Sequence, residues 1–378
     1  MTGTSPSQTA TQLFAELLRG EAIGRSAFRM TSDEFLRACG ERDLIGLTHE
    51  RLRGLPEACD WPRDIREALA RESRAQAAKE LLRRKELISV LDVLAAEGIY
   101  PLLLKGTALA YSLYDNPASR PRVDTDLLIQ RSQVDLVRRA MARCGYTPPT
   151  HCDGELVFCQ FPLKKTDAFG FIHAFDVHWK ISTQSMFANI LIDEELAPSA
   201  VPVPALGPHA RAVGPVHALL LACIHPVMHH RNTECLIWIY DVHLIASGLS
   251  DDELERFAGL AIDKRVAAVC ARGLALARSL FGTRLPEGVV ARLGEPRVPE
   301  PSEVYLRASR RWHHELLSNL RGLGRPTERA HLLREVLVPR PRYMLDSYGF
   351  GVIGYVLLPA LYVHRVMNGV WKILRGRK

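Results

Sequence analysis

Two aspartates separated by a single residue are the clearest sign of chemistry in this sequence. Asp124 and Asp126 begin an apolar segment that predicts a β-strand, in which alternate side chains project from the same face. Two carboxylates held side by side repel each other strongly unless a cation lies between them. Because all of the donor atoms are oxygens, the pair predicts a site for Mg²⁺ or Mn²⁺ rather than for zinc.

A third carboxylate lies in a later apolar segment. Asp176 begins the run Asp-Val-His within another predicted strand. If that strand is a neighbour of the first, three carboxylates meet on one patch and supply the ligands of a two-metal phosphoryl-transfer site. His178 lies on the same face as Asp176. Two roles stay open for it: contact with substrate or a carboxylate, and a structural place beside Trp179.

The chain before the aspartate pair contains a candidate phosphate-binding turn. Lys105, Gly106 and Thr107 follow an apolar run over 99–104 and precede a helical pattern over 108–114. The backbone N–H groups of such a turn, and the helix N-terminus after it, can bind an anion. Gly106 lets a phosphate approach the backbone, Thr107 offers a hydroxyl donor, and Lys105 offers an ammonium. The turn and the aspartate pair are each common alone, but their combination in this order is rare.

Apolar periodicity predicts that these residues belong to one small α/β unit. Residues 99–180 read in the order β-α-β-α-β-β. The expected strands are 99–104, 125–130, 156–163 and 171–180. Helical patterns precede and follow this unit, so we expect an α+β fold in which a small mixed sheet is embedded in a mostly helical protein. The expected regions are an N-terminal helical region (1–98), the α/β core (99–182), a helical acceptor-side domain (183–300) and a C-terminal helical region with a basic tail (301–378).

These motifs resemble those of a known enzyme superfamily. LLLKGTALAYSLY, RPRVDTDLLIQ and FDVHWK are similar to the core of the polymerase-beta-like nucleotidyltransferases. They are more similar still to a bacterial family of largely uncharacterised nucleotidyltransferases. The segments LLLACIHPVMHHRNTECLIWIYDVHLIAS and LLPALYVHRVMNGV also resemble that family, so the likeness runs from about residue 60 through most of the chain.

The resemblance implies a reaction and a set of roles. A nucleoside monophosphate would pass from a nucleoside triphosphate, ATP by default, to an acceptor hydroxyl, and pyrophosphate would leave. Carried over to this sequence, the triphosphate would bind at Gly106 and Thr107, and two divalent ions at Asp124 and Asp126. Asp176 would complete the metal site and orient the acceptor hydroxyl. The identity of the acceptor and of the nucleotide base stays open.

This sequence departs from the superfamily pattern at two points. Thr107 stands where Ser or Gly is usual, which retains a hydroxyl. The segment between Thr107 and Asp124 is also longer than usual and contains Arg120 and Arg122. Two interpretations stay open for these arginines: contact with substrate phosphate, and simple solvation.

A histidine cluster offers a rival metal site. His225 and His229 are spaced for one face of a predicted helix, and His230, Asp241 and His243 lie nearby in sequence. However, no Glu follows the first histidine as a hydrolytic zinc motif requires, and a proline comes directly after it. A helix that lines the acceptor pocket or packs on the core is therefore favoured over zinc.

Composition limits the partners and the compartment. The 378 residues carry 49 Lys and Arg against 42 Asp and Glu, a net charge of +7. This excess suits an anionic partner such as a nucleotide, but it is too dilute to indicate nucleic-acid binding. The eight cysteines show no C-x-x-C or zinc-type spacing, and the first residues show no leader-like pattern. We therefore expect reduced thiols and a cytoplasmic location.

The C-terminal residues 349–378 combine an apolar run with several basic residues. One interpretation is weak peripheral contact with anionic lipid. The favoured interpretation is a terminal helix packed on the helical domain, with a solvated basic tail. Two non-enzymatic alternatives also stay open for the chain: a catalytically silent nucleotide-binding adaptor, and a peripheral membrane scaffold.

Overall fold

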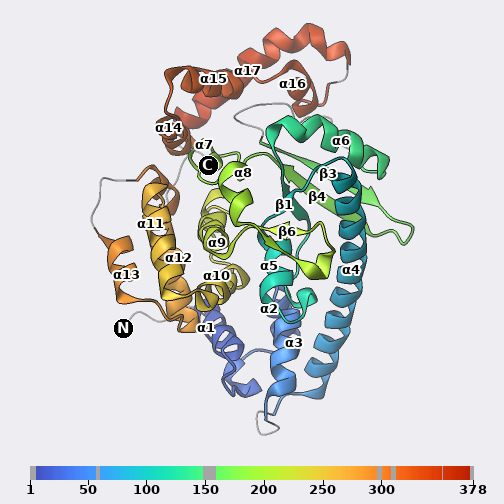
Figure 1. The fold of residues 1–378 in the computed structure, drawn as a ribbon, viewed down its shortest axis with the longest axis vertical. Coiled ribbons are helices and arrows are strands. Elements are labelled where there is room, and N and C mark those ends of the chain that lie inside the picture. Colours follow the sequence, from blue (N-terminus) through green and yellow to red (C-terminus); the bar gives the residue numbers. More distant parts are fainter. Residues whose placement is uncertain are drawn as a thin grey trace.

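A computed structural model describes residues 6–56, 60–147, 159–295, 300–307, 312–350 and 352–374. Most of these residues are helical, and a single mixed sheet lies among the helices (Figure 1). The strands are β1 (Leu102–Leu103), β2 (Thr125–Leu128), β3 (Gln160–Thr166), β4 (Ile172–His178), β5 (Val201–Pro202) and β6 (Arg211–Ala212). The predicted α+β class, with a small mixed sheet in a mostly helical protein, is confirmed.

The sheet has the strand order β3-β4-β2-β1-β6-β5. β2 is parallel to β4 and antiparallel to β1, while β3 and β4 form an antiparallel hairpin. With α5 (Lys105–Leu113) and α6 (Val134–Arg143), the chain follows the predicted β-α-β-α-β-β order. The hairpin turn was predicted too early, because β3 continues to Thr166; residues 156–158 of the predicted strand lie outside the described residues. The short strands β5 and β6 were not predicted.

Alternation along the strands gives the sheet two different faces. Leu103, Leu127 and Val177 belong to an apolar cluster that also contains Leu87, Val90, Leu91 and Leu94 of α4 (Arg63–Ala96). The other face carries Leu102 and Leu128, which pack into the larger core formed with the later helices. Because side chains alternate with a period of two, Asp126 shares the face of Leu128. The long helix therefore covers the apolar face and leaves the acidic face to the later helices.

The N-terminal helices form one end of the molecule, and α4 connects that end to the sheet (Figure 1). They are α1 (Pro6–Leu18), α2 (Ser32–Glu41) and α3 (Ile45–Gly54). Rings of Phe14, Phe28, Phe35 and Trp61 pack together in this end. Helix α4 stops where Gly98 takes a positive φ of 73°, a conformation that glycine adopts at little cost.

Helices after the sheet build the rest of the core. They are α7 (Ser185–Ala188), α8 (Asp193–Leu196), α9 (Pro215–His229), α10 (Leu236–Gly248), α11 (Asp251–Asp263), α12 (Ala267–Phe281) and α13 (Glu287–Gly294). Residues 215–248 and 251–281 each form a pair of helices. All six cysteines that the structure describes are free thiols.

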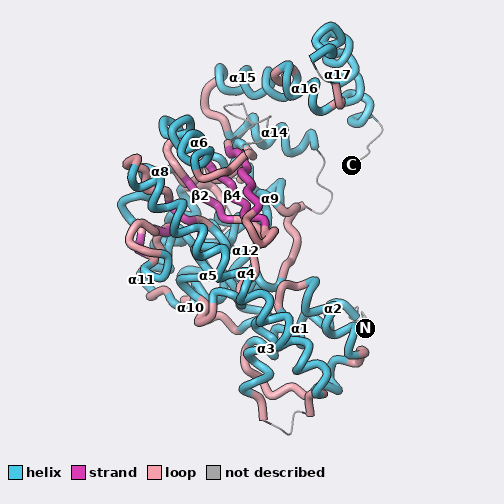
Figure 2. Tube along the Cα trace, turned by 90° about the vertical axis from the view of Figure 1, so that its right-hand side faces the viewer, coloured by secondary structure: helices cyan, strands magenta, loops and turns pink. Residues whose placement is uncertain are grey.

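The C-terminal helices lie at the end of the molecule opposite α1–α3 (Figure 2). They are η7 (Pro301–Leu306), α14 (Trp312–Gly322), α15 (Pro326–Leu337), α16 (Pro341–Ser347), η8 (Val352–Leu357) and α17 (Leu358–Leu374). Helix α14 packs on α7 and η7, whereas α17 packs on α15, α16 and η8. None of the helices in the described ranges has both the length and the apolar character needed to cross a bilayer.

Candidate functional site

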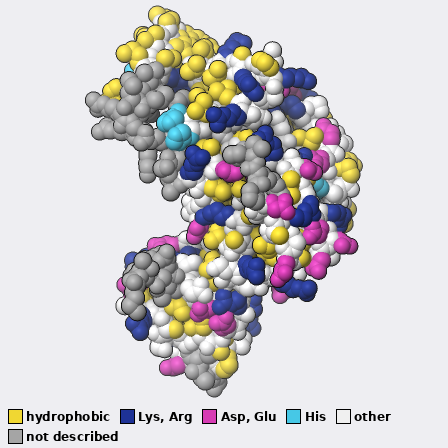
Figure 3. All heavy atoms as spheres, turned by 90° about the vertical axis from the view of Figure 1, so that its left-hand side faces the viewer, with side chains coloured by type: hydrophobic (Ala, Val, Ile, Leu, Met, Phe, Trp, Pro, Cys, Tyr) yellow, Lys and Arg dark blue, Asp and Glu magenta, His cyan; other side chains and the backbone are white. Residues whose placement is uncertain are grey.

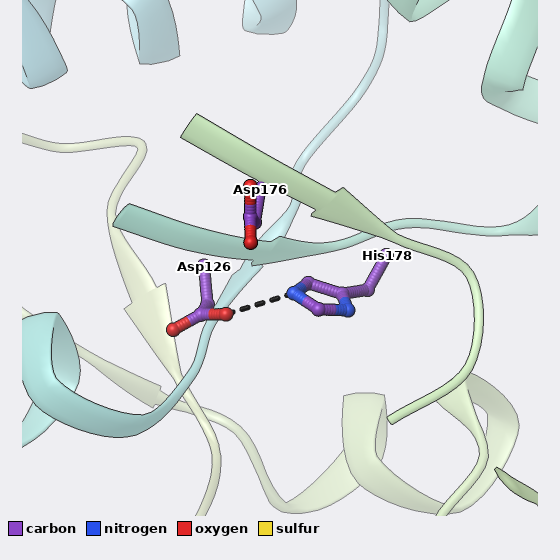
Figure 4. A group of neighbouring side chains, drawn as sticks. All are labelled: Asp126, Asp176 and His178. Atoms are coloured by element: carbon purple, nitrogen blue, oxygen red, sulfur yellow. Dashed lines mark hydrogen bonds and ion pairs between the residues drawn. The ribbon is translucent and has the colours of Figure 1, made fainter. Parts of the chain in front are cut away.

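Asp126 and Asp176 lie directly opposite each other on neighbouring parallel strands. The two residues are register partners in β2 and β4, and Leu128 pairs with His178 two positions later. The side chains of Asp126, Asp176 and His178 therefore share one face of the sheet and point toward one another (Figure 4). One ligand atom from each lies within 4.8 Å of the other two. The predicted neighbourhood of the two strands, on which the site depended, is confirmed.

Asp126 carries two hydrogen bonds on one oxygen. Lys105 Nζ donates to Asp126 Oδ1 at 2.7 Å, and His178 Nε2 lies 2.8 Å from the same atom. Burial by itself raises the pKa of Asp126, but the Lys105 ammonium and His178 hold that pKa well below its usual range. Of the two open roles of His178, the structure shows the hydrogen bond to a carboxylate. Asp126 is thus ionised at neutral pH.

The negative charges of the other two carboxylates, Asp124 and Asp176, are less well neutralised by neighbouring groups. Asp124 lies just before β2, where burial and the charges of Asp126 and Asp176 raise its pKa to about 6. Burial, followed by the charge of Asp126, also raises the pKa of Asp176, whose Oδ2 accepts a hydrogen bond from Gln160 Nε2 at 3.2 Å. In the described part of the chain, no Lys or Arg lies within salt-bridge distance of Asp124 or Asp176. A patch with this surplus of negative charge favours a bound cation.

The turn beside this patch is strained at its lysine. Lys105, the first residue of α5, has a φ of 49°, a left-handed conformation that costs a non-glycine residue about 1–2 kcal/mol. Gly106 lines the cavity at this point, and a Cβ added to it would meet Arg120 Nη1 at 3.5 Å, an ordinary contact. This glycine therefore leaves room in the cavity rather than avoiding a clash.

Thr107 differs from its predicted placement. Its side chain is buried, its hydroxyl lies 3.5 Å from Thr125 Oγ1, and it is not among the residues that line the cavity. In this conformation the hydroxyl faces the sheet because α5 begins at Lys105 and turns the third residue of the motif inward. Of the three residues of this turn, Lys105 and Gly106 line the cavity, and a phosphate contact from Thr107 stays a prediction.

Arg120 and Arg122 are held in buried ion pairs. Arg120 Nη2 donates to Asp241 Oδ2 at 2.8 Å, and Arg122 donates to both carboxylate oxygens of Glu80 at 2.7 and 2.8 Å. The interpretation of these side chains as simply solvated is wrong, because both partners of each pair are buried. Both arginines tie the loop before β2 to helices α10 and α4. Both also line the cavity, and contact with a substrate phosphate stays a prediction.

A cavity of about 400 Å³ opens from the carboxylates and runs between α5, α9 and α10. Its charged lining includes Lys105, Asp124, Asp126 and Asp176, and Gly106 lies beside them. Much of the remaining wall is apolar and comes from Leu109, Leu113, Ala218, Leu221, Ala222 and Ile245. A mainly apolar wall with a few charged groups is typical of small-molecule sites.

His225, His229 and His230, at the C-terminal end of α9, line this cavity. Burial, followed by the charge of Lys105, lowers the pKa of His225, of His229 (to about 4) and of His230, so the imidazoles are neutral at pH 7. Within the described ranges, the only group of three metal-type ligands that converges is Asp126, Asp176 and His178. The structure thus gives the rival zinc site no support and favours α9 as a wall of the pocket.

Three cavity residues were not singled out from the sequence. Gln160 is on β3 beside Asp176, Asp43 precedes α3, and Trp238 on α10 packs against His230 with ring centroids 4.4 Å apart. Alternation along β3 could have indicated Gln160, because it shares a sheet face with the carboxylates. Asp43 gave no such signal, because its place depends on the packing of distant helices.

Comparison with known families agrees with this geometry. The model of a family described as uncharacterised nucleotidyltransferase matches residues 30–282. The chain belongs to this family. The site carboxylates, the turn at Lys105 and the histidines at the end of α9 of this nucleotidyltransferase lie inside the matched range. The C-terminal helices, with the segment LLPALYVHRVMNGV, lie outside it. No curated protein sequence matches the chain.

Proposed function

We propose that this nucleotidyltransferase transfers a nucleoside monophosphate from a nucleoside triphosphate, ATP by default, to the hydroxyl of an acceptor, and releases pyrophosphate. The observation that carries the proposal is the pairing of Asp126 with Asp176 beside the turn at Lys105 and Gly106. An anion-binding turn next to converging carboxylates is the arrangement that a metal-bridged triphosphate needs.

The residues of the acidic patch fit Mg²⁺ or Mn²⁺. Asp124, Asp126 and Asp176 would hold the ions through oxygen atoms. The pKa values of Asp124 and Asp176 are raised because the protein itself supplies too little positive charge to neutralise them. When bound, divalent ions neutralise the triphosphate and lower the pKa of the attacking hydroxyl. His178 would fix the orientation of Asp126 through its hydrogen bond.

Lys105 has two partners available in this scheme. Its ammonium now neutralises Asp126 at 2.7 Å. Once Asp126 has another cation as partner, Lys105 can turn to the phosphates and balance charge there, while the Gly106 backbone N–H can donate to a phosphate oxygen. Asp176 would orient the acceptor hydroxyl and accept its proton as that oxygen attacks the α-phosphorus in line with the leaving pyrophosphate.

The wall of the cavity that α9 forms would bind the acceptor. The neutral imidazoles of His225 and His229 can donate or accept hydrogen bonds with a hydroxyl-bearing molecule, and the buried His225 Nδ1 has no hydrogen-bond partner in the described structure. The apolar wall from α5, α9 and α10 suits the less polar part of that molecule.

A silent nucleotide-binding adaptor is the second candidate. One observation favours it: Lys105 and His178 both engage the same oxygen of Asp126. An adaptor of this kind would bind nucleotide but release no pyrophosphate.

Pyrophosphate release separates the two candidates. The purified chain is incubated with Mg²⁺, each nucleoside triphosphate and panels of hydroxyl-bearing small molecules, sugars and peptides, and nucleotide binding is measured in parallel by calorimetry. We expect release with at least one acceptor, lost in Asp124→Asn and Asp126→Asn and retained in Asp252→Asn, an exposed carboxylate on α11. Equal activity in the two site variants would eliminate this site; binding without release across all panels would favour the adaptor.

A further inference from the structure

The positive charge of this protein is concentrated at its C-terminal end. Residues 321–378, here called the basic C-terminal segment, contain eleven Lys and Arg against three Asp and Glu, a net charge of +8. The whole chain carries +7, so residues 1–320 carry −1. From Ser347 to Lys378 the sequence contains no acidic residue. A surface that bears this segment attracts anions over a range set by ionic strength.

The same segment exposes much apolar surface. Of the eighteen large apolar side chains that are exposed within the described ranges, ten lie between Leu337 and Trp371. Figure 3 shows hydrophobic side chains gathered at the upper end of the molecule, which the C-terminal helices form. Single exposed apolar side chains are ordinary, whereas a gathered group marks an interaction surface.

Helix α17 presents its apolar side outward. Val363, Met367 and Trp371 recur every four residues, and 59%, 66% and 43% of their surfaces are exposed. Residues spaced in this way lie on one stripe of a helix. On a helix that serves only to cover a protein core, this stripe would face inward.

Polar groups hold the opposite side of α17 to its neighbours. The Tyr362 hydroxyl donates to the carbonyl of Pro339, and the Arg365 guanidinium donates to the carbonyl of Val336 at 3.2 and 3.3 Å. Because these bonds fix the helix rotation, the apolar stripe is held in the exposed position.

We propose that α17 and the basic residues after it dock this protein in the plane of a membrane surface rich in anionic lipid. Such a surface offers an apolar layer for Val363, Met367 and Trp371 and negative headgroups that attract the charge of the basic C-terminal segment. A second copy of the same segment is a poorer occupant, because it would bring +8 against +8. This inference does not depend on the proposed reaction.

Vesicle co-sedimentation of the full chain tests the proposal. Wild type is expected to sediment with vesicles of phosphatidylcholine and phosphatidylserine, to stay in solution with phosphatidylcholine alone, and to be released by high salt. The Val363→Glu/Met367→Glu variant is expected to bind at least about tenfold more weakly. The matched control, Phe169→Glu/Ile172→Glu, adds the same charges at two exposed apolar positions near the β3–β4 turn and is expected to bind like wild type.

A second variant covers the case in which the glutamates disturb folding. Replacing Lys372, Arg375, Arg377 and Lys378 with Gln leaves the apolar stripe intact, and we expect at least about tenfold weaker binding to the anionic vesicles. The proposal is overturned if wild type stays in solution with anionic vesicles, or if the glutamate and glutamine variants both bind like wild type. It is also overturned if light scattering shows that the stripe pairs two copies of the chain while vesicles are not bound.

Discussion

Asp126 and Asp176 are register partners on the parallel strands β2 and β4, so their carboxylates are held side by side on one face of the sheet. Only one of them has a strong cationic partner, because Lys105 and His178 both engage Asp126. The protein therefore maintains one firmly ionised carboxylate next to two, Asp124 and Asp176, whose pKa values are raised. A divalent cation would remove this imbalance.

Asp176→Asn tests the second strand of the site. The amide can keep a polar contact with Gln160, and the change removes a repelling charge, so we expect no loss of stability. Nucleotidyl transfer should fall at least about 100-fold, because a metal ligand and the group that receives the hydroxyl proton are lost. Pyrophosphate release and thermal unfolding are measured on the same preparation. Unchanged activity would remove Asp176 from the mechanism.

The affinity for divalent cations should fall as the pH drops through about 6. Asp124 has a raised pKa of about 6 because it is buried beside Asp126 and Asp176, and protonation removes its charge. Calorimetric titration with Mn²⁺ at pH 5 and pH 8 measures the effect, which is at most about tenfold per pH unit for one proton. His229, with a pKa of about 4, does not titrate in this window. Equal affinities at the two pH values would contradict the assignment of Asp124.

Asp124→Asn should stabilise the metal-free protein at pH 8. A carboxyl whose pKa is raised by folding favours the folded state while protonated, and that stability is lost as the pH rises through about 6. The displacement from 3.8 corresponds to at most about 3 kcal/mol, so a neutral amide should recover about 1–3 kcal/mol at pH 8 and little at pH 4. Denaturant unfolding in EDTA at both pH values gives the answer. A variant less stable than wild type at pH 8 would show that Asp124 is not under repulsion.

Much of the site follows from local sequence, because its parts are short and each sits on one element. The strands predicted before Lys105, after Asp124 and around Asp176 are all present, although β1 is limited to Leu102–Leu103 of the predicted 99–104, and β2 and β4 are neighbours. The end of β1 and the start of β2 meet because these two strands are antiparallel, and the parallel pairing of β2 with β4 places Asp126 opposite Asp176.

The features of the site that could not be predicted depend on residues that are distant in the sequence. Arg120 pairs with Asp241, and Arg122 pairs with Glu80 on α4; no local pattern specifies either pair. The hydroxyl of Thr107 was predicted to donate to a phosphate, but the helix that begins at Lys105 turns this side chain toward the sheet. β5 and β6 are each two residues long, which is too short for an alternating apolar pattern that would predict a strand.

Glu80→Ala tests the anchor of the loop before β2. Glu80 accepts hydrogen bonds from Arg122 and from the Tyr111 hydroxyl, and its removal leaves a buried guanidinium without its partner. We expect a loss of about 3–5 kcal/mol in the free energy of unfolding. Glu72→Ala, an exposed position on the same helix, is the matched control and should change stability by less than about 0.5 kcal/mol. A similar effect in both variants would mean that the buried pair is not an anchor.

Anomalous X-ray diffraction from crystals grown with Mn²⁺ and a non-hydrolysable nucleoside triphosphate analogue tests whether Asp126 and Asp176 bind a metal ion. We expect a manganese peak at the carboxylates of Asp126 and Asp176, with the analogue's phosphates over Lys105 and Gly106. A peak bound instead by His225 and His229, or nucleotide density away from the acidic patch, would contradict it.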